Sequence, residues 1–288
     1  MADTTIATVA NQIRTEWGPV FDMELREKFI LPALVDKTPG GLSTIRQGDT
    51  IKVSQVNKMT GELLTIGTNA DAFTPEALAL QNVDVVVDKR AVASIVVDDL
   101  VELQSQINLQ RQDVRDAMGH GMNSQINTHL YSTVAPTTTT TAATLAASDL
   151  LTAKLEADQK FWPEGQRWCI VDPAYYSDLL ADQTITNNDF GASDRPVIGG
   201  QFVLQRYGWN IVMDNSAAMT TALNAGTAGA ALFFIPNFMY FVIQQAANTK
   251  VSDRHSNNEF KIGMSVDTVF GALLSNDGAD KHIVYKSL

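Results

Sequence analysis

The chain has 288 residues, which favours two linked subdomains over a single compact core. Its formal net charge is −11, from 32 acidic and 21 basic residues. Because no cluster of lysine and arginine stands out, the composition argues against a protein that grips nucleic acid by its phosphates. One cysteine, Cys169, excludes an intramolecular disulfide, and neither a secretory signal peptide nor a transmembrane helix is expected.

Residues 4–30 are predicted to form a helical arm in two pieces. The first piece carries apolar residues at helical spacing up to Trp17. After a Gly-Pro break, the second piece places Phe21 and Phe29 on one face. Two helices this short have little core of their own. We therefore expect these aromatic side chains to pack on another surface, such as a neighbouring subunit.

A hairpin with a very long loop is predicted next. One strand is expected at Thr50–Val56, and a second extended run, Val83–Val97, places its apolar residues on one face at period two. Loops as long as 57–79 are rare in compact domains and usually have a task. Apolar side chains on such a loop are costly to leave in water, which points to a partner surface. The loop residues proposed to contact a neighbouring subunit are Lys58, Leu63, Leu64, Ile66 and Phe73.

Residues 98–131 give the strongest helical pattern, with one apolar stripe along a helix roughly 50 Å long. Gly119 and Gly121 lie inside this helix and are expected to weaken or bend it. The stretch Pro136–Thr141, a proline followed by five threonines, lacks apolar residues and favours extended backbone. It is predicted to be a linker between two subdomains.

The second half alternates helices and strands. Asp172 is expected to cap a short helix that has Pro173 at its first position. Two apolar runs around Pro236–Asn237 predict a hairpin. The elements expected in this half are a helix from Ser148 or Asp149 through Phe161, strands at Trp168–Val171 and Trp209–Met213, the hairpin of Ala231–Ile235 and Phe238–Ile243, and terminal strands at Phe260–Val266, Val269–Leu274 and His282–Tyr285.

Signals for chemistry are weak, and no catalytic residue, metal ligand or cofactor is predicted. Neither a phosphate-binding loop nor a nucleophile elbow occurs in the sequence. His120 and His129 fall on opposite faces of the long helix and could not share a metal. Asp253–His255 reads better as a solvated loop than as a catalytic cluster. Ser275–Gly278 reads better as a turn than as part of a calcium loop, and Cys169 as a core residue.

The order of elements resembles the major capsid protein of tailed double-stranded-DNA bacteriophages, whose fold is shared with encapsulins and the herpesvirus capsid floor. Three segments carry the resemblance. Ser43–Val56, STIRQGDTIKVSQV, is similar to the strand that enters the family's extended loop. Glu164–Leu180, EGQRWCIVDPAYYSDLL, is similar to a strand and proline-started helix of its axial domain. Gln201–Asn215, QFVLQRYGWNIVMDN, is similar to two strands around an aromatic-glycine turn.

The resemblance implies an α+β fold and a division of the whole chain into the family's parts. These would be an N-terminal arm and lead-in at 1–47, an extended-loop hairpin at 48–97, a peripheral domain with a spine helix and hinge at 98–144, an axial domain at 145–247, and terminal strands returning to the peripheral domain at 248–288.

The resemblance also implies a function: self-assembly into hexamers and pentamers that form the icosahedral shell around a phage genome. Family-like sequence begins within the first few residues, which implies a separate scaffolding protein. A portal protein and a decoration protein are further expected partners, packaged DNA would be contacted only non-specifically, and no membrane is involved. The chain would assemble in the host cytoplasm and reside in the virion capsid. The alternatives are an encapsulin-like cellular shell protein and an α/β enzyme.

Overall fold

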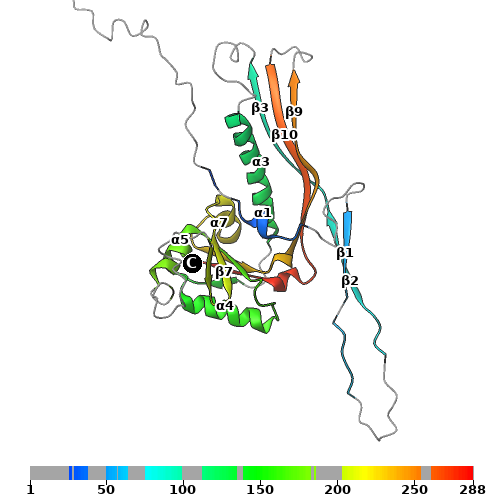
Figure 1. The fold of residues 1–288 in the computed structure, drawn as a ribbon, viewed down its shortest axis with the longest axis vertical. Coiled ribbons are helices and arrows are strands. Elements are labelled where there is room, and N and C mark those ends of the chain that lie inside the picture. The colour runs from blue at the N-terminus through cyan, green and yellow to red at the C-terminus, as the bar shows by residue number, and fades with distance from the viewer. Residues whose placement is uncertain are drawn as a thin grey trace, which may run out of the picture.

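The computed structural model of the chain contains three sheets and a long helix (Figure 1). It describes residues 26–27, 29–37, 50–56, 58–63, 75–98, 112–134, 139–182, 185, 203–253 and 261–287. The sheets have two, three and six strands, in the orders β1-β2, β3-β10-β9 and β4-β11-β8-β5-β7-β6. No described helix is long and apolar enough to span a membrane.

The two-stranded sheet is a hairpin that stands out from the rest of the molecule (Figure 1). It pairs β1 (Thr50–Val56) antiparallel with β2 (Leu80–Val86). The predicted first strand is confirmed. The predicted second run, Val83–Val97, is divided at Asp88, because β2 pairs with β1 whereas β3 (Lys89–Asp98) pairs with β10 in another sheet. Its period-two burial continues across this change of sheet.

The three-stranded sheet places β10 (Lys261–Leu274) between β3 and β9 (Met239–Asp253). Helix α3 (Gln112–Thr133) covers one face and buries the predicted stripe against it; the buried stripe residues are Met118, Met122, Ile126 and Leu130. The predicted helix start at 98 is wrong, since Asp98 is the last residue of β3 and pairs with Lys261. Residues 99–111 lie outside the described residues.

Helices cover both faces of the six-stranded sheet. Its strands are β4 (Thr139–Thr141), β5 (Trp168–Val171), β6 (Val203–Arg206), β7 (Trp209–Met213), β8 (Ala230–Phe234) and β11 (His282–Lys286). Alternation along β5 separates the two faces. Cys169 packs toward α4 (Ala147–Gln159) and α5 (Pro173–Ala181), whereas Ile170 packs toward α7 (Ala217–Asn224) and α3.

Two local predictions in this sheet are confirmed at atomic detail. The Asp172 side chain accepts a hydrogen bond of 3.0 Å from the Tyr175 amide, so it caps α5 as expected. Tyr207 and Gly208 join β6 to β7 with φ values of 51° and 83°. Positive φ at both central residues is the requirement of a tight hairpin turn, which explains the aromatic-glycine pair.

Two predictions of strand pairing are wrong, and the predicted linker has a further role. Thr139–Thr141 is not only a linker: its extended backbone pairs parallel with β11 as an edge strand. His282–Lys286 does not return to the sheet of the long helix but pairs with β8. The apolar hairpin around Pro236–Asn237 does not form, because β8 and β9 belong to different sheets. A 3-10 helix, Pro236–Phe238, carries the chain from one sheet to the other.

Candidate functional site

The projecting β1–β2 hairpin is the most distinctive functional feature of the described chain. Its inner face packs onto β9, where Ile51, Val53, Val85 and Val87 form a small cluster with Val242. Two hydrogen bonds also hold the hairpin to the body of the molecule. Gln55 Nε2 donates to Asp277 Oδ2 at 3.2 Å, and Asn276 Nδ2 donates to the Gln81 carbonyl at 3.4 Å. The base of the hairpin is therefore held by the body while its far end projects.

The outer part of the hairpin leaves apolar side chains in water. Val56 and Leu80 pair directly across the two strands and are both exposed. Leu63, which the sequence places at a subunit contact, is 97% exposed. Leu64, Ile66 and Phe73 lie outside the described residues. The free subunit thus offers an apolar projection without covering it, as expected of a surface that another molecule covers.

Lys58 has a contact within its own subunit. Its Nζ atom lies 5.4 Å from the centroid of the Phe161 ring, at the carboxyl end of α4. This is within cation–π range. The base of the long loop therefore reaches the helix that begins the six-stranded half of the chain. The predicted role of Lys58 at a subunit contact stays a prediction.

The described part of the N-terminal arm packs on α3. The Phe29 ring lies 4.9 Å from the His120 ring, centroid to centroid, and Leu31 in α1 (Leu31–Leu34) is fully buried. Glu27 Oε1 accepts a hydrogen bond of 3.3 Å from the Ala217 amide at the start of α7. Trp17 and Phe21 lie outside the described residues. The subunit contact predicted for Phe29 stays a prediction.

A buried polar network, which sequence reasoning missed, joins α3 to the six-stranded sheet. Tyr131 Oη donates to Asp214 Oδ2 at 2.6 Å, and the Ser216 amide donates to Asp214 Oδ1 at 2.8 Å. Asn127 Nδ2 donates to Ser216 Oγ at 3.1 Å. Burial raises the pKa of the Asp214 carboxyl, although hydrogen bonds from Tyr131 and Ser216 oppose this shift. The network fixes the long helix relative to the sheet.

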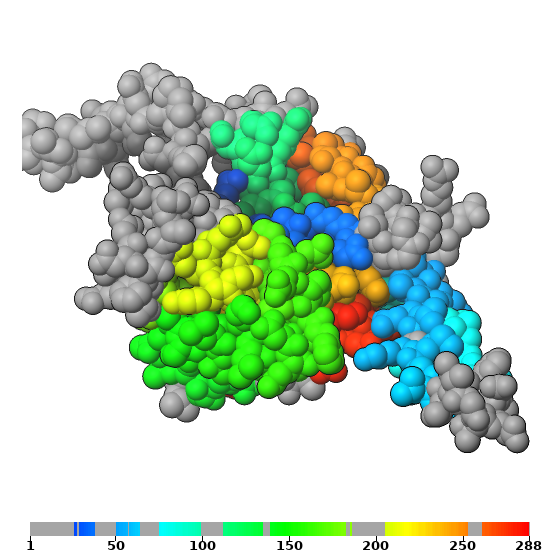
Figure 2. Space-filling view, turned by 60° about the horizontal axis from the view of Figure 1, so that its bottom comes forward, coloured from blue at the N-terminus to red at the C-terminus, as the bar shows by residue number. Residues whose placement is uncertain are grey.

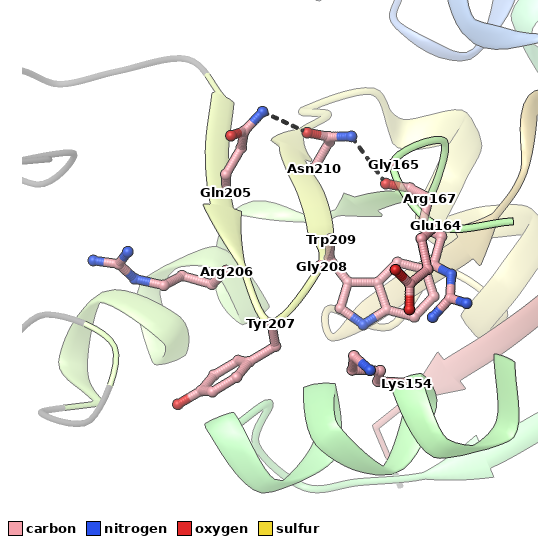
Figure 3. Close-up of a pocket in the computed structure, with 10 residues that line it drawn as sticks. All are labelled: Lys154, Glu164, Gly165, Arg167, Gln205, Arg206, Tyr207, Gly208, Trp209 and Asn210. Atoms are coloured by element: carbon pink, nitrogen blue, oxygen red, sulfur yellow. Dashed lines mark hydrogen bonds between the residues drawn. The ribbon is translucent and has the colours of Figure 1, made fainter. Parts of the chain in front are cut away.

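A shallow pocket of about 430 Å³ lies between α4 and the two turns before β5 and β7 (Figure 3). Several of its polar groups are bound to each other or to their neighbours. Asn210 accepts from Gln205 Nε2 at 2.8 Å and donates to the Arg167 carbonyl at 3.2 Å. Lys154 and Arg167 pair with Asp158 at 3.0 and 2.6 Å. The lining residues hold no nucleophile paired with a base, so the pocket has the character of a structural cleft.

The remaining candidates for chemistry are scattered. His120 and His129 pack on different aromatic partners, Phe29 and Phe270. Ser275–Gly278 forms a turn, in which the Gly278 amide donates to the Ser275 carbonyl at 2.8 Å. Cys169 is fully buried, as predicted, and burial raises the pKa of its thiol. Of Asp253–His255, the last two residues lie outside the described ones. Among the residues that the structure describes, no group of three or more histidine, cysteine or carboxylate side chains could hold a metal ion.

The fold was compared with known proteins. Neither a protein-family model nor a curated protein sequence matches the chain. Solved phage structures match over nearly its whole length. A chain of Mycobacterium phage Che8 has a TM-score of 0.74 and 15% identity, covering 95% of this chain and 96% of that one. A chain from the capsid structure of cyanophage P-SCSP1u has a TM-score of 0.72 and 19% identity, covering 98% and 94%.

A third match has the least sequence similarity of the three and the highest structural similarity. It is a chain from the acidic stable capsid structure of Helicobacter pylori bacteriophage KHP30, with a TM-score of 0.76 and 11% identity, covering 99% of both chains. At such identities the likeness establishes the fold. The chain therefore has the α+β fold of the chains in these phage structures, which confirms the fold predicted from its sequence.

Proposed function

We propose that the chain is the major capsid protein of a tailed bacteriophage, which assembles into hexamers and pentamers that form an icosahedral shell around the genome. One observation carries the proposal: the fold matches chains of phage capsid structures from end to end, including 99% of both chains for phage KHP30. A shared fold alone does not fix a function. The surface of the described residues supplies the second argument.

The chain offers both halves of a head-to-tail contact. Its projecting half is the hairpin, with Leu63 and other apolar side chains in water. A receiving half is the apolar hollow of about 560 Å³ between β3 and α3, which is lined by Ala93, Ser94, Ile95, Asp113, Val114, Ala117 and Met118. Covering apolar surface stabilises by about 25 cal/mol per Å². When each copy gives one such surface and receives its complement, a closed ring results if the rotation closes.

The N-terminal arm would add a second contact between copies. Trp17, Phe21 and Phe29 would supply this contact, with Phe29 also packing on α3 of its own chain. We also propose that Leu64, Ile66 and Phe73 join Leu63 in the contact made by the loop.

The partners and the location follow from the same proposal. A separate scaffolding protein would guide assembly in the host cytoplasm, a portal protein would occupy one vertex, and a decoration protein is a further candidate partner. The net charge of −11 is compatible with a shell that contacts its packaged DNA only weakly. The role proposed is structural rather than catalytic.

The decisive variant replaces residues 58–78 by an Asn-Gly turn. The β1–β2 pairing that ends at Val56 and Leu80 should persist, because a two-residue turn sets the same register. The subunit should fold with an unchanged circular dichroism spectrum, yet form no shells when scaffolding protein is supplied. Two single variants separate the loss of an apolar side chain from a general disturbance of the loop. Leu63→Ser removes an exposed apolar side chain, and Thr60→Ser, which exchanges one polar residue for another, is its control. Shells of normal size and yield from the shortened subunit would contradict the proposal.

A further inference from the structure

The outward side of α4 and α5 consists mostly of uncharged residues, and the charged side chains Lys154 and Asp158 on it are paired with each other. The exposed residues of α4 are Ser148, Leu151, Thr152, Leu155, Asp158 and Gln159, and those of α5 are Pro173, Ala174, Ser177, Leu180 and Ala181. Asp158 is the one charged residue among them, and it is paired with Lys154 and Arg167. A helix that faces water normally carries charged residues on its outer side. This surface, called the α4–α5 face below, lies at the front of Figure 2 in green.

The carboxylates of Asp149 and Asp178, and of Asp182 just after α5, bind backbone amides near the start of α4. Asp178 Oδ2 and Asp182 Oδ2 accept from the Leu145 and Ala147 amides, at 3.3 and 2.8 Å. Asp149 Oδ2 accepts from the Ala146 amide at 2.9 Å. The acidic side chains thus satisfy the free amides at the start of α4. Asp178 and Asp182 also tie the end of α5 to the start of α4.

The most exposed side chains of this surface include large apolar ones. Leu151 and Leu155 lie one turn apart in α4 and are 48% and 59% exposed. At the carboxyl end of the helix, Phe161 is 85% exposed and has a φ of 57°. Positive φ is costly for a bulky residue and uncommon outside glycine. Lys58 Nζ lies over one part of the Phe161 ring, and most of the ring is left in water.

We propose that the α4–α5 face is a contact between copies of this chain in the assembled shell, with Leu151 and Leu155 at its centre. This inference rests on the proposed function. Charge favours a second copy as the occupant. A basic partner would be met by acidic side chains, whereas two copies that each carry −11 approach best through a surface of mostly uncharged residues.

The size of the α4–α5 face favours an assembly rather than an isolated dimer. With 13 residues, α4 is about 20 Å long. A helix of this length and about 10 Å in diameter offers on the order of 200 Å², and the shorter α5 offers less. A stand-alone interface buries about 800 Å² on each partner. The α4–α5 face can therefore hold copies together only alongside other contacts. Lys58 over the Phe161 ring connects it to the hairpin, which supplies one.

The first test adds charge to the face. Leu155→Glu should leave the thermal melting of the free subunit nearly unchanged, because the side chain is already exposed. It should lower the yield of shells at least about tenfold when scaffolding protein is supplied, since every contact would then bury a charge without a partner. Thr221→Glu, an exposed position of α7 on the opposite side of the six-stranded sheet, is the control and should assemble normally.

The second test measures whether the face is covered. The only native thiol, Cys169, is buried, so a Leu155→Cys thiol can be labelled selectively with a maleimide. Labelling should be fast in free subunits and at least about tenfold slower in shells from which scaffolding protein has left. Equal labelling in both states, or normal shells from Leu155→Glu, would overturn the inference while leaving the proposed function intact. If the wild-type chain forms no shells at all, the proposed function itself is wrong.

Discussion

Gly271 of β10 marks the point where the hairpin base passes closest to the body of the molecule. A Cβ atom added there would overlap the carbonyl oxygen of Val86, and would lie 2.9 Å from its carbonyl carbon and 3.0 Å from the Cα atom of Val87. All three atoms belong to the backbone and cannot rotate away. Overpacking of this kind typically costs about 1–3 kcal/mol. We therefore expect Gly271→Ala to lower the free energy of unfolding by at least this amount and to displace the hairpin base.

The same substitution in α3 provides a matched control. No heavy atom lies within 4 Å of the Cβ that Gly119→Ala would add. Replacing glycine inside a helix by alanine should instead stabilise the subunit by roughly 0.4–1 kcal/mol. Urea unfolding of the free subunits, monitored by circular dichroism, measures both effects. If Gly271→Ala unfolds at the wild-type urea concentration and assembles with wild-type yield, the close approach at the hairpin base is wrong.

Two further substitutions test contacts of α3: the hydrogen bond from Tyr131 to Asp214, and the partly buried position of His129. Tyr131→Phe removes the hydroxyl that donates to the buried Asp214 and should lower the free energy of unfolding in urea by about 1–3 kcal/mol, whereas Tyr207→Phe, in the turn between β6 and β7, should lower it little. Burial, followed by the charge of Lys89, lowers the pKa of His129, so the folded state disfavours its protonation. Stability contributed by neutral His129 is present above pH 6.5 and is lost as the pH falls through its lowered folded pKa. His129→Gln should therefore lose less stability between pH 8 and pH 5 than the wild type, and parallel losses would contradict this assignment.

The elements that could be predicted from the sequence are those specified by neighbouring residues. Asp172 followed by proline defines the start of a helix, and Tyr207-Gly208 defines a tight turn, because each acts within a few residues. The period-two run after Val83 is likewise local, so its burial was predicted correctly. The division of this run between two sheets could not be predicted, because an alternating pattern does not specify which strand pairs with which.

Partners distant in the chain account for the errors. Thr139–Thr141 and His282–Lys286 are far apart in sequence, and nothing in either segment specifies that they pair. The sequence does not show that the chain changes sheet at Pro236, because apolar residues continue on both sides of this position. Tyr131 and Asp214 are 83 residues apart and are buried as a pair, so neither residue alone signals the contact.

The candidate site was predicted in part for the same reason. Apolar residues in a long loop are a local signal, and the structure leaves Leu63 in water as this signal suggested. The α4–α5 face could not be predicted as a unit, because its two helices are separated in the sequence by β5. One local signal was available: Leu151 and Leu155 are spaced by four residues, outside the stripe that begins with the buried Leu150.

Electron cryomicroscopy of particles formed by the full chain with its scaffolding protein tests the central claim most directly. The proposed function predicts closed icosahedral shells in which the hairpin of residues 50–86 from every copy lies on the adjacent copy, with Leu63 covered. A chain that stays monomeric under these conditions, or shells in which each hairpin contacts only its own subunit, would contradict it.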